Sequence, residues 1–136
     1  MKKFKVYNVS NHPSTKWSEE QKKATIEKAM FLSESNIIEI EDIPFPNIPP
    51  NMDKDDVADL ADEYVTKIKN ANDASFIIVN GEMNFTFSFV SFAIERGLKC
   101  FTATTERISE DKKNEDGTTT KVSIFKFVKL REYLNE

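Results

Sequence analysis

The stretch ASFIIVN, residues 74–80, decides the fold class of this chain. Phenylalanine, two isoleucines and valine follow one another in it without an intervening polar residue. A strand with one wet face alternates between apolar and polar side chains, whereas a strand covered on both faces is apolar throughout. The run stops at Asn80, Gly81 and Glu82, a typical turn sequence. The stretch therefore predicts an interior strand of a parallel sheet that ends in a loop.

Two further strands are predicted upstream. FKVYNV at 4–9 is a short run of high β propensity, and the loop-forming segment SNHP at 10–13 follows it. NIIEIEDI at 36–43 has the same character and gives the second strand. With the stretch at 74–80, the first 80 residues of the chain thus supply three strands.

Two helices are predicted between these strands. Ser18 and Gln21 have the spacing of a capping box, so a helix should begin there and run to about Leu32. The segment 44–50 holds four prolines, which forbid a regular helix or central strand, and we expect a stiff loop. From Asp53 onward the apolar residues follow helical spacing, with acidic residues at the favourable end of the helix dipole. These apolar positions are Val57, Leu60, Ala61, Tyr64 and Ile68.

The segment NFTFSFVSFAIER at 84–96 fits two patterns. Its phenylalanines alternate at first, as in a strand, while Phe85, Phe89 and Phe92 share one helical face. Gly97 stands where a helix C-cap glycine is expected. We predict a helix, because a helix followed by the strand KCFTAT completes a third β–α repeat, whereas a strand would leave two long β segments without a crossover.

The C-terminal part is predicted to leave the parallel sheet. KCFTAT at 99–104 gives a fourth strand, and TATTER at 102–107 is predicted to form the loop at its end. RISED at 107–111 and KVSIFKFVKL at 121–130 flank the hairpin signal Asp-Gly at 116–117, so the chain should end as an antiparallel ribbon. All 136 residues are expected to form one domain: a Rossmann-like, three-layer α/β fold with a mainly parallel sheet and a C-terminal antiparallel hairpin.

Composition and charge argue against several classes of function. The net charge is −4, whereas affinity for duplex nucleic acid comes mainly from neutralising many phosphates. One histidine and one cysteine cannot form a zinc site, and no glycine-rich nucleotide loop is present, so no metal and no cofactor are expected. Cys100 lies in the apolar run LKCF and is expected to be a buried, inert thiol. No apolar run is long enough for a signal peptide or a membrane helix, so we expect a cytoplasmic protein.

Three loops are the predicted place of a binding site, because ligands of open parallel sheets bind beyond the carboxyl ends of the strands. The loops are 10–15, 80–86 and 102–107. They hold the only histidine of the chain together with one arginine, two glutamates and many hydroxyl and amide groups. Hydroxyls, amides and a guanidinium are groups that bind phosphate without a metal.

Each candidate also has a purely structural interpretation. His12 suits a plain turn, and Arg107 suits an ion pair with a neighbouring glutamate on a solvated ribbon. Thr104 and Thr105 suit a strand through their β propensity alone. Glu82 suits the N-terminus of a helix, where an acid stabilises the dipole.

Several motifs carry a resemblance to a known family. They are the amide-Gly-acid turn at 80–82, ATTER at 103–107, the Asp-Gly hairpin and the closing FKFVKLREY at 125–133. With SNHPSTKWSEEQ at 10–21, they make most of the chain resemble small CRISPR-associated proteins of the Csx type, which are related to the CARF-like (CRISPR-associated Rossmann-fold) ring nucleases. Phe127 departs from the pattern, since a histidine is expected there.

The resemblance implies a cytoplasmic homodimer that binds cyclic oligoadenylate, with cyclic tetra-adenylate as the expected ring. It implies metal-independent cleavage to linear products with a 2′,3′-cyclic phosphate, which switches off type III CRISPR signalling in antiviral defence. Neither duplex DNA nor a membrane is an expected partner. The expected catalytic residues are His12, Arg107 and Glu82. The expected ligand-binding residues are Ser10, Asn11, Ser14, Asn80, Gly81, Asn84, Thr102, Thr104, Thr105, Lys126 and Arg131.

Two other functions stay open at this point. A sensor or sponge would bind the ring without cutting it, which the single histidine suggests. A nucleoside deoxyribosyltransferase-like enzyme would use Glu82 as a nucleophile on a small Rossmann fold.

Overall fold

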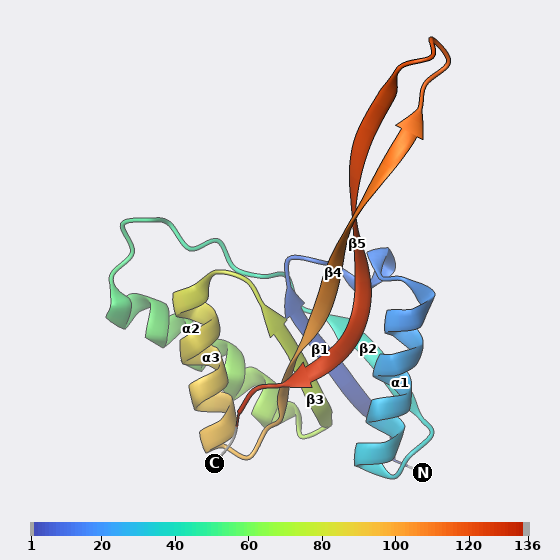
Figure 1. Ribbon diagram of the computed structural model, residues 1–136. Coiled ribbons are helices and arrows are strands. Elements are labelled where there is room, and N and C mark those ends of the chain that lie inside the picture. Colours follow the sequence, from blue (N-terminus) through green and yellow to red (C-terminus); the bar gives the residue numbers. More distant parts are fainter. Residues whose placement is uncertain (1, 135–136) are drawn as a thin grey trace.

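The computed structural model describes residues 2–134. One five-stranded sheet of order β2-β1-β3-β4-β5 runs through the molecule (Figure 1). The first four strands in this order are parallel, and β5 is antiparallel to β4. In chain order the elements are β1 (Phe4–Ser10), the 3-10 turn η1 (Ser14–Lys16), α1 (Glu19–Ser33), β2 (Ile38–Asp42), α2 (Lys54–Ala71), β3 (Ala74–Asn80), α3 (Met83–Glu95), β4 (Cys100–Lys113) and β5 (Thr119–Glu132).

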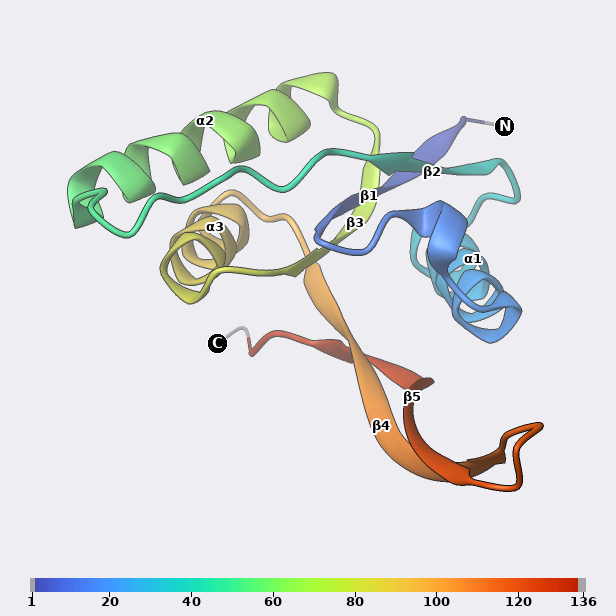
Figure 2. The same cartoon turned by 90° about the horizontal axis from the view of Figure 1, so that it is seen from above.

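Helices cover both faces of this sheet (Figure 2). α1 lies alone on one face, while α2 and α3 lie side by side on the other. One apolar core fills the space between the sheet and the α2–α3 layer, and a second core lies beneath α1. The predicted three-layer α/β arrangement with a mostly parallel sheet and an antiparallel C-terminal pair is therefore confirmed, consistent with a Rossmann-like fold.

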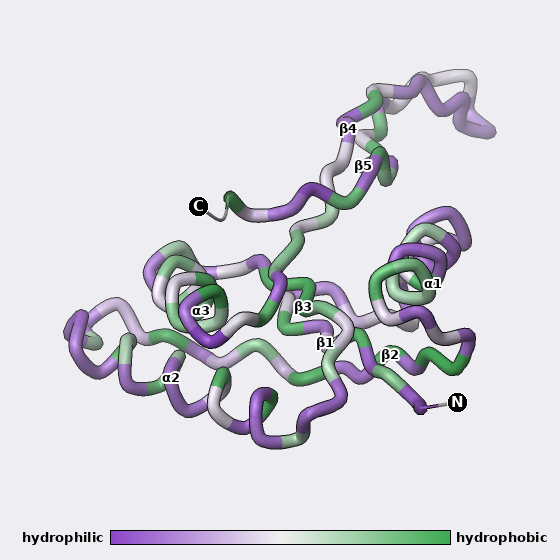
Figure 3. The backbone as a smooth tube through the Cα atoms, turned by 90° about the horizontal axis from the view of Figure 1, so that it is seen from below, coloured by the Kyte–Doolittle hydropathy of each residue, from purple (hydrophilic) through white to green (hydrophobic). Residues whose placement is uncertain are grey.

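β3 is buried on both faces, as its sequence predicts. Phe76 and Ile78 belong to the core beneath α1, and Ile77 and Val79 belong to the core beneath α2 and α3. All four are at most 2% exposed. Figure 3 colours the backbone by the hydropathy of each residue. Hydrophobic residues gather around β1 and β3, whereas the far end of the β4–β5 ribbon is largely hydrophilic.

β4 and β5 form a long two-stranded ribbon that projects past the carboxyl ends of β1 and β3 (Figure 1). β4 pairs with β3 only through Cys100 and Phe101, and beyond these residues it pairs with β5 alone as far as Lys113. The prediction of a loop at 102–107 was therefore wrong, because these residues lie inside one continuous strand. β5 supplies their backbone hydrogen-bond partners, so β4 keeps its β conformation when it leaves β3.

The local signals for the helices are confirmed. Ser18 Oγ accepts a hydrogen bond from the backbone N–H of Gln21 at 3.1 Å, so Ser18 is the N-cap of α1. The phenylalanine-rich segment is helical, and it ends just before Gly97, whose φ of 80° is the left-handed conformation that glycine adopts freely. No helix within residues 2–134 combines the length and the apolar character needed to cross a membrane.

We predict that Gly81→Ala lowers the free energy of unfolding. A Cβ atom at Gly81 would lie 2.3 Å from ring atoms of Phe45, whose ring packs edge-on against Phe85 at 5.1 Å between centroids. Overpacking of this kind costs about 1–3 kcal/mol, which urea unfolding can measure. In a Phe45→Leu background the same substitution should cost less, and an equal cost in both backgrounds would show that the ring is not the obstacle.

Candidate functional site

The candidate site lies at the carboxyl end of the sheet, where the chain connections diverge. β1 continues through α1 to β2 on one side of it, whereas β3 lies on the other side of β1 and is reached through α2 on the opposite face (Figure 2). The ends of β1 and β3 are direct neighbours, since Ser10 pairs with Asn80. Ligands of open α/β sheets bind at such a switch point. The loops that follow Ser10 and Asn80 therefore form the centre of the candidate site.

Hydrogen bonds to one carbonyl group hold the loop after β1. The carbonyl oxygen of His12 accepts from Asn8 Nδ2 at 2.8 Å and from Trp17 Nε1 at 3.1 Å. Asn8 and Trp17 are 1% and 7% exposed, so these donors are fixed by the core. Ser10 Oγ accepts from the backbone N–H of His12 at 3.2 Å. The backbone of the loop is thereby fixed, while the side chains of Asn11 and His12 are exposed.

Asp42, the last residue of β2, ties the same loop to the sheet. Its carboxylate accepts from Asn8 Nδ2 at 2.8 Å, from the backbone N–H of Ser14 at 3.0 Å and from Ser14 Oγ at 2.7 Å. Partial burial acts to raise the pKa of this carboxyl, but the hydrogen bonds from Asn8 and Ser14 outweigh it and hold the pKa of Asp42 below its ordinary value. Ser14 is thus engaged in a structural clamp in this structure.

Glu82 caps α3. Its carboxylate accepts from the backbone N–H of Phe85 at 2.8 Å and of Asn84 at 3.1 Å. The structural interpretation of Glu82, as the cap of a helix, therefore has direct support. The two backbone N–H groups at the start of α3 already donate to a carboxylate of their own chain. Packing explains why residue 81 is a glycine, since the Phe45 ring occupies the space that a Cβ atom would need. The side chains of Asn80 and Asn84 are exposed at this edge.

Thr104 has a structural role in the ribbon. Thr104 lies opposite Lys129 while Thr105 lies opposite Phe127, so Val128 is an extra residue in β5 and the ribbon contains a β-bulge. Thr104 Oγ1 accepts from the backbone N–H of Lys129 at 3.2 Å and donates to its carbonyl oxygen at 3.0 Å. The threonine hydroxyl therefore completes the hydrogen bonding at the bulge.

The other predicted ribbon residues lie on the surface. Arg107 donates to Ser123 Oγ from Nε at 3.2 Å and from Nη2 at 3.0 Å. Among the described residues Arg107 makes this contact and not the ion pair with a neighbouring glutamate that its structural interpretation suggests. Lys126 and Arg131 are also exposed, and Arg131 lies opposite the half-buried Thr102. Arg107 and Lys126 thus lie on the part of the ribbon beyond its pairing with β3, whereas Arg131 lies next to that pairing.

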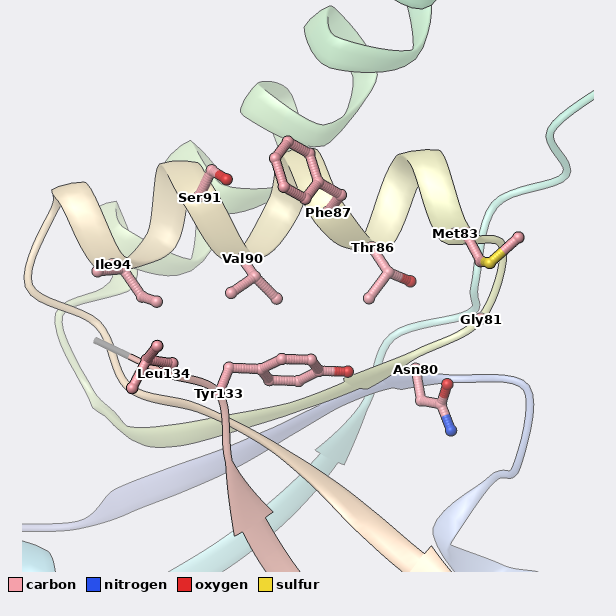
Figure 4. Close-up of a pocket in the computed structure, with 10 residues that line it drawn as sticks. All are labelled: Asn80, Gly81, Met83, Thr86, Phe87, Val90, Ser91, Ile94, Tyr133 and Leu134. Carbon is pink, nitrogen blue, oxygen red and sulfur yellow. The ribbon is translucent and has the colours of Figure 1, made fainter. Parts of the chain in front are cut away.

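Two hollows lie near this edge. One, of about 350 Å³, is lined by residues that include Ser10, Asn11 and Asp42. The other, of about 660 Å³, begins at Asn80 and Gly81 and runs along α3 (Figure 4). Neither hollow is lined by His12 or by the ribbon residues up to 132. A single copy therefore brings the ends of β1 and β3 together but does not place His12 and Arg107 in either hollow.

Two further sequence-based expectations concern buried side chains. Cys100 is 1% exposed, and burial, with a smaller contribution from Glu132, raises the pKa of its thiol to about 12. The expectation of a buried thiol is thus confirmed, and the raised pKa disfavours the reactive thiolate form. Phe127 is 9% exposed, so the position where the resemblance calls for a histidine holds a buried ring. Within residues 2–134 no three His, Cys, Asp or Glu side chains gather in an arrangement that could hold a metal ion.

Sequence reasoning missed Asn8, Trp17 and Asp42, which position the His12 loop. One signal was available, since Asn8 is an amide inside the apolar strand FKVYNV, and a buried amide requires hydrogen-bond partners. Its partners are the carbonyl of His12 and the carboxylate of Asp42, which lies on another strand. That second contact depends on the parallel pairing of β1 with β2, in which Asn8 is aligned with Asp42.

Comparison with known proteins places the chain in a family. Residues 4–131 match the "Uncharacterized protein MJ1673 family", and the chain belongs to this family. Over 88 residues it is 32% identical to "Uncharacterized protein MJ1673" of Methanocaldococcus jannaschii. The match covers 64% of this chain and 66% of that protein, a little under two thirds of its length. No solved structure matches the chain.

We predict that Asp42→Asn destabilises the protein at neutral pH and much less in acid. Because the pKa of Asp42 is lowered in the folded state, its stabilisation is present above the unfolded pKa of about 3.9 and is lost as the pH falls through the folded value. The carboxylate is partly exposed, so the neutral-pH difference should be only about 1 kcal/mol. Urea unfolding at pH 7 and pH 3 measures it, and a difference that grows on acidification would contradict the clamp.

Proposed function

We propose that this protein is a homodimeric, CARF-like ring nuclease. It binds cyclic oligoadenylate at the carboxyl edge of its sheet and cleaves it to linear products with a 2′,3′-cyclic phosphate, which switches off type III CRISPR signalling in the cytoplasm. Cyclic tetra-adenylate is the expected ring. The observation that carries the proposal is the pairing of Ser10 with Asn80, which sets the His12 loop beside the loop after β3. The site is thereby at the switch point that open α/β sheets use for ligands.

The ribbon is the proposed source of positive charge. A ring of phosphates is a polyanion, and a protein with a net charge of −4 has to gather cations locally to hold it. Arg107, Lys126 and Arg131 are exposed on the ribbon, which extends past the same edge (Figure 1). In one copy these residues line neither of the two hollows. A symmetric dimer would supply two sets of loops and two ribbons around one ring, which has rotational symmetry of its own.

Cleavage is proposed to use the 2′-hydroxyl of the substrate as the nucleophile. The O2′–P bond forms, the P–O5′ bond breaks, one proton leaves the 2′-hydroxyl and one reaches the departing 5′-oxygen. His12 is suited to transfer one of these protons, because its backbone is fixed by Asn8 and Trp17 while its imidazole is exposed. Arg107 is the proposed partner of the charge that develops on the phosphate oxygens. Asn11, Asn80 and Thr105 would orient ribose and phosphate.

The cap at α3 bears on the alternatives. Because Glu82 accepts two backbone N–H groups, we assign it to positioning α3 and the loop after β3, not to nucleophilic attack. This contact also speaks against a deoxyribosyltransferase-like reaction, which needs a free carboxylate. The second candidate is a protein that binds the ring without cutting it. The carboxylates of Glu82 and Asp42 are both occupied by hydrogen bonds within the chain. Among the described residues of the two loops, His12 is therefore left as the side chain for proton transfer, and cleavage has to achieve two proton transfers.

We predict that His12→Ala slows cleavage about 10²–10⁴-fold while leaving ring affinity and folding stability unchanged. The reason is that the hydrogen bonds of His12 are made by its backbone, not by its imidazole. The protein is incubated with EDTA and rings of three, four or six adenylates, and linear products are resolved by chromatography. Lys16→Ala, an exposed change nearby in η1, serves as the control. Tight binding by the unaltered protein without any linear product would select the sponge, and no binding of any ring would reject both functions.

We predict that Arg107→Ala weakens ring binding about 30-fold or more, because contacts to a desolvated phosphate are worth roughly 2–5 kcal/mol. Arg107 contacts Ser123 in the free protein, so its loss should leave the unfolding transition nearly unchanged. Lys121→Ala removes an exposed cation further along the same ribbon and should have a small effect. Isothermal titration with cyclic tetra-adenylate measures both. Equal losses for the two variants would mean that only the overall charge matters.

A further inference from the structure

α3 carries large apolar side chains on two faces, although Asn84 and Ser91 are exposed on its outer face as well. Phe85, Phe89 and Ala93 are fully buried in the core beneath it. On the outer face Met83 and Phe87 are 83% and 75% exposed. No charged residue occurs between 83 and 94. A surface helix normally carries a polar outer face, and a helix that is apolar all round is normally buried. The apolar part of the outer face of α3 therefore calls for a cover that residues 2–134 of one copy do not provide.

The groove of about 660 Å³ runs along this outer face. Thr86, Val90 and Ile94 point into it from α3, and Tyr133 and Leu134 form the opposite wall (Figure 4). This wall is held in place, because Tyr133 Oη donates to the carbonyl oxygen of Val79 at 2.8 Å and the backbone N–H of Tyr133 donates to the carbonyl oxygen of Cys100 at 2.9 Å. The groove is thus a built feature between a helix and a fixed C-terminal segment.

The same surface carries both a projection and a hollow. Phe87 stands out beside the groove, and Leu134 at the far wall is 86% exposed. A two-fold axis next to α3 would set Phe87 of each copy against the groove of the other, as an isologous contact requires. Two chains that each carry a net charge of −4 repel each other in general, but this surface has no charge to repel. A second copy of the chain is therefore the occupant that fits.

The size of the surface agrees with a dimer of modest affinity. Met83, Phe87 and Leu134 together expose on the order of 400 Å² of apolar area per copy, and isolated patches of a few hundred Å² already mark interaction sites. With a polar rim the contact would reach the lower end of specific interfaces, at roughly 1,200 Å² in total. We propose that the α3 surface, defined as Met83, Phe87, Val90, Ile94 and Leu134, joins two copies of this chain.

The contact would also border the candidate site. Asn80 and Gly81 line one end of the groove, so a partner seated on α3 would lie against the loop after β3. This inference rests on the proposed function only for the existence of a dimer. The surface itself is identified without reference to any ligand.

Phe87→Asp and Phe31→Asp test the surface as a matched pair. Phe31 is 78% exposed, nearly as much as Phe87, but it lies on α1 at the opposite face of the sheet (Figure 2). Sedimentation velocity without ligand, from low to several hundred micromolar protein, should find a dimer for the unaltered chain and for Phe31→Asp. Phe87→Asp should raise the dimer dissociation constant at least ~100-fold, since a symmetric contact loses the side chain twice. Circular dichroism checks that both variants fold, and Phe87→Ser is the second variant should Phe87→Asp fold poorly.

Three outcomes would overturn the inference. They are a monomer over the whole concentration range, equal dissociation constants for the two variants, or a monomer that retains a small apolar molecule in native mass spectrometry. Ring binding measured separately distinguishes the two proposals. A ring-binding dimer that ignores Phe87→Asp refutes the α3 surface alone, whereas a Phe87-dependent dimer that binds no ring refutes the proposed function alone.

Discussion

The parallel pairing of β1 with β3 between two apolar layers is the constraint on which the rest of the structure depends. It aligns Ser10 with Asn80 and so sets two polar loops side by side. β3 is apolar on both faces, so a slip by one residue would bury no polar group on that strand, and its own pattern does not select the register. The buried Asn8 on β1 selects the register of the neighbouring β1–β2 pair, since it needs the carboxylate of Asp42 on β2 as well as the carbonyl of His12. One amide thereby connects the register of the sheet with the shape of the candidate site.

Local signals were sufficient for most of the fold. The apolar run at 74–80 and the Ser18 cap each express a preference of a few neighbouring residues, and both appear in the structure as predicted. The stretch 102–107 was mispredicted because its conformation is decided elsewhere in the chain. Its threonines have ordinary β propensity, but whether β4 continues past β3 depends on β5, which lies about twenty-five residues further along and supplies the hydrogen bonds. The Asp-Gly signal at 116–117 predicts that two segments pair, but it does not show that the pairing extends back to Phe101.

The candidate site, too, was predicted only in part from the sequence. The general rule for open α/β sheets located the loops after β1 and β3, because it needs only the order of strands and helices. It did not reveal which polar side chains in these loops are already engaged. Glu82, Ser14 and Thr104 were all candidates for contact with a ligand, and each makes hydrogen bonds that hold its own backbone segment in place. A cap, a clamp and a bulge use the same residue types as a phosphate site, so type and spacing alone do not separate them.

The exposed apolar side chains of α3 indicate a contact with another molecule. Its outer face breaks the usual rule that a surface helix is polar outward, and such exceptions gather where a protein meets another molecule. The groove on that face ends at Asn80, which also pairs with the end of β1 at the switch point. Whatever covers α3 therefore forms part of the surroundings of the candidate site. If covering α3 changes the affinity of that site for its ligand, the ligand must change the affinity of the cover by the same factor. Assembly and ligand binding are thus expected to be linked through the two-residue loop, Gly81 and Glu82, between β3 and α3.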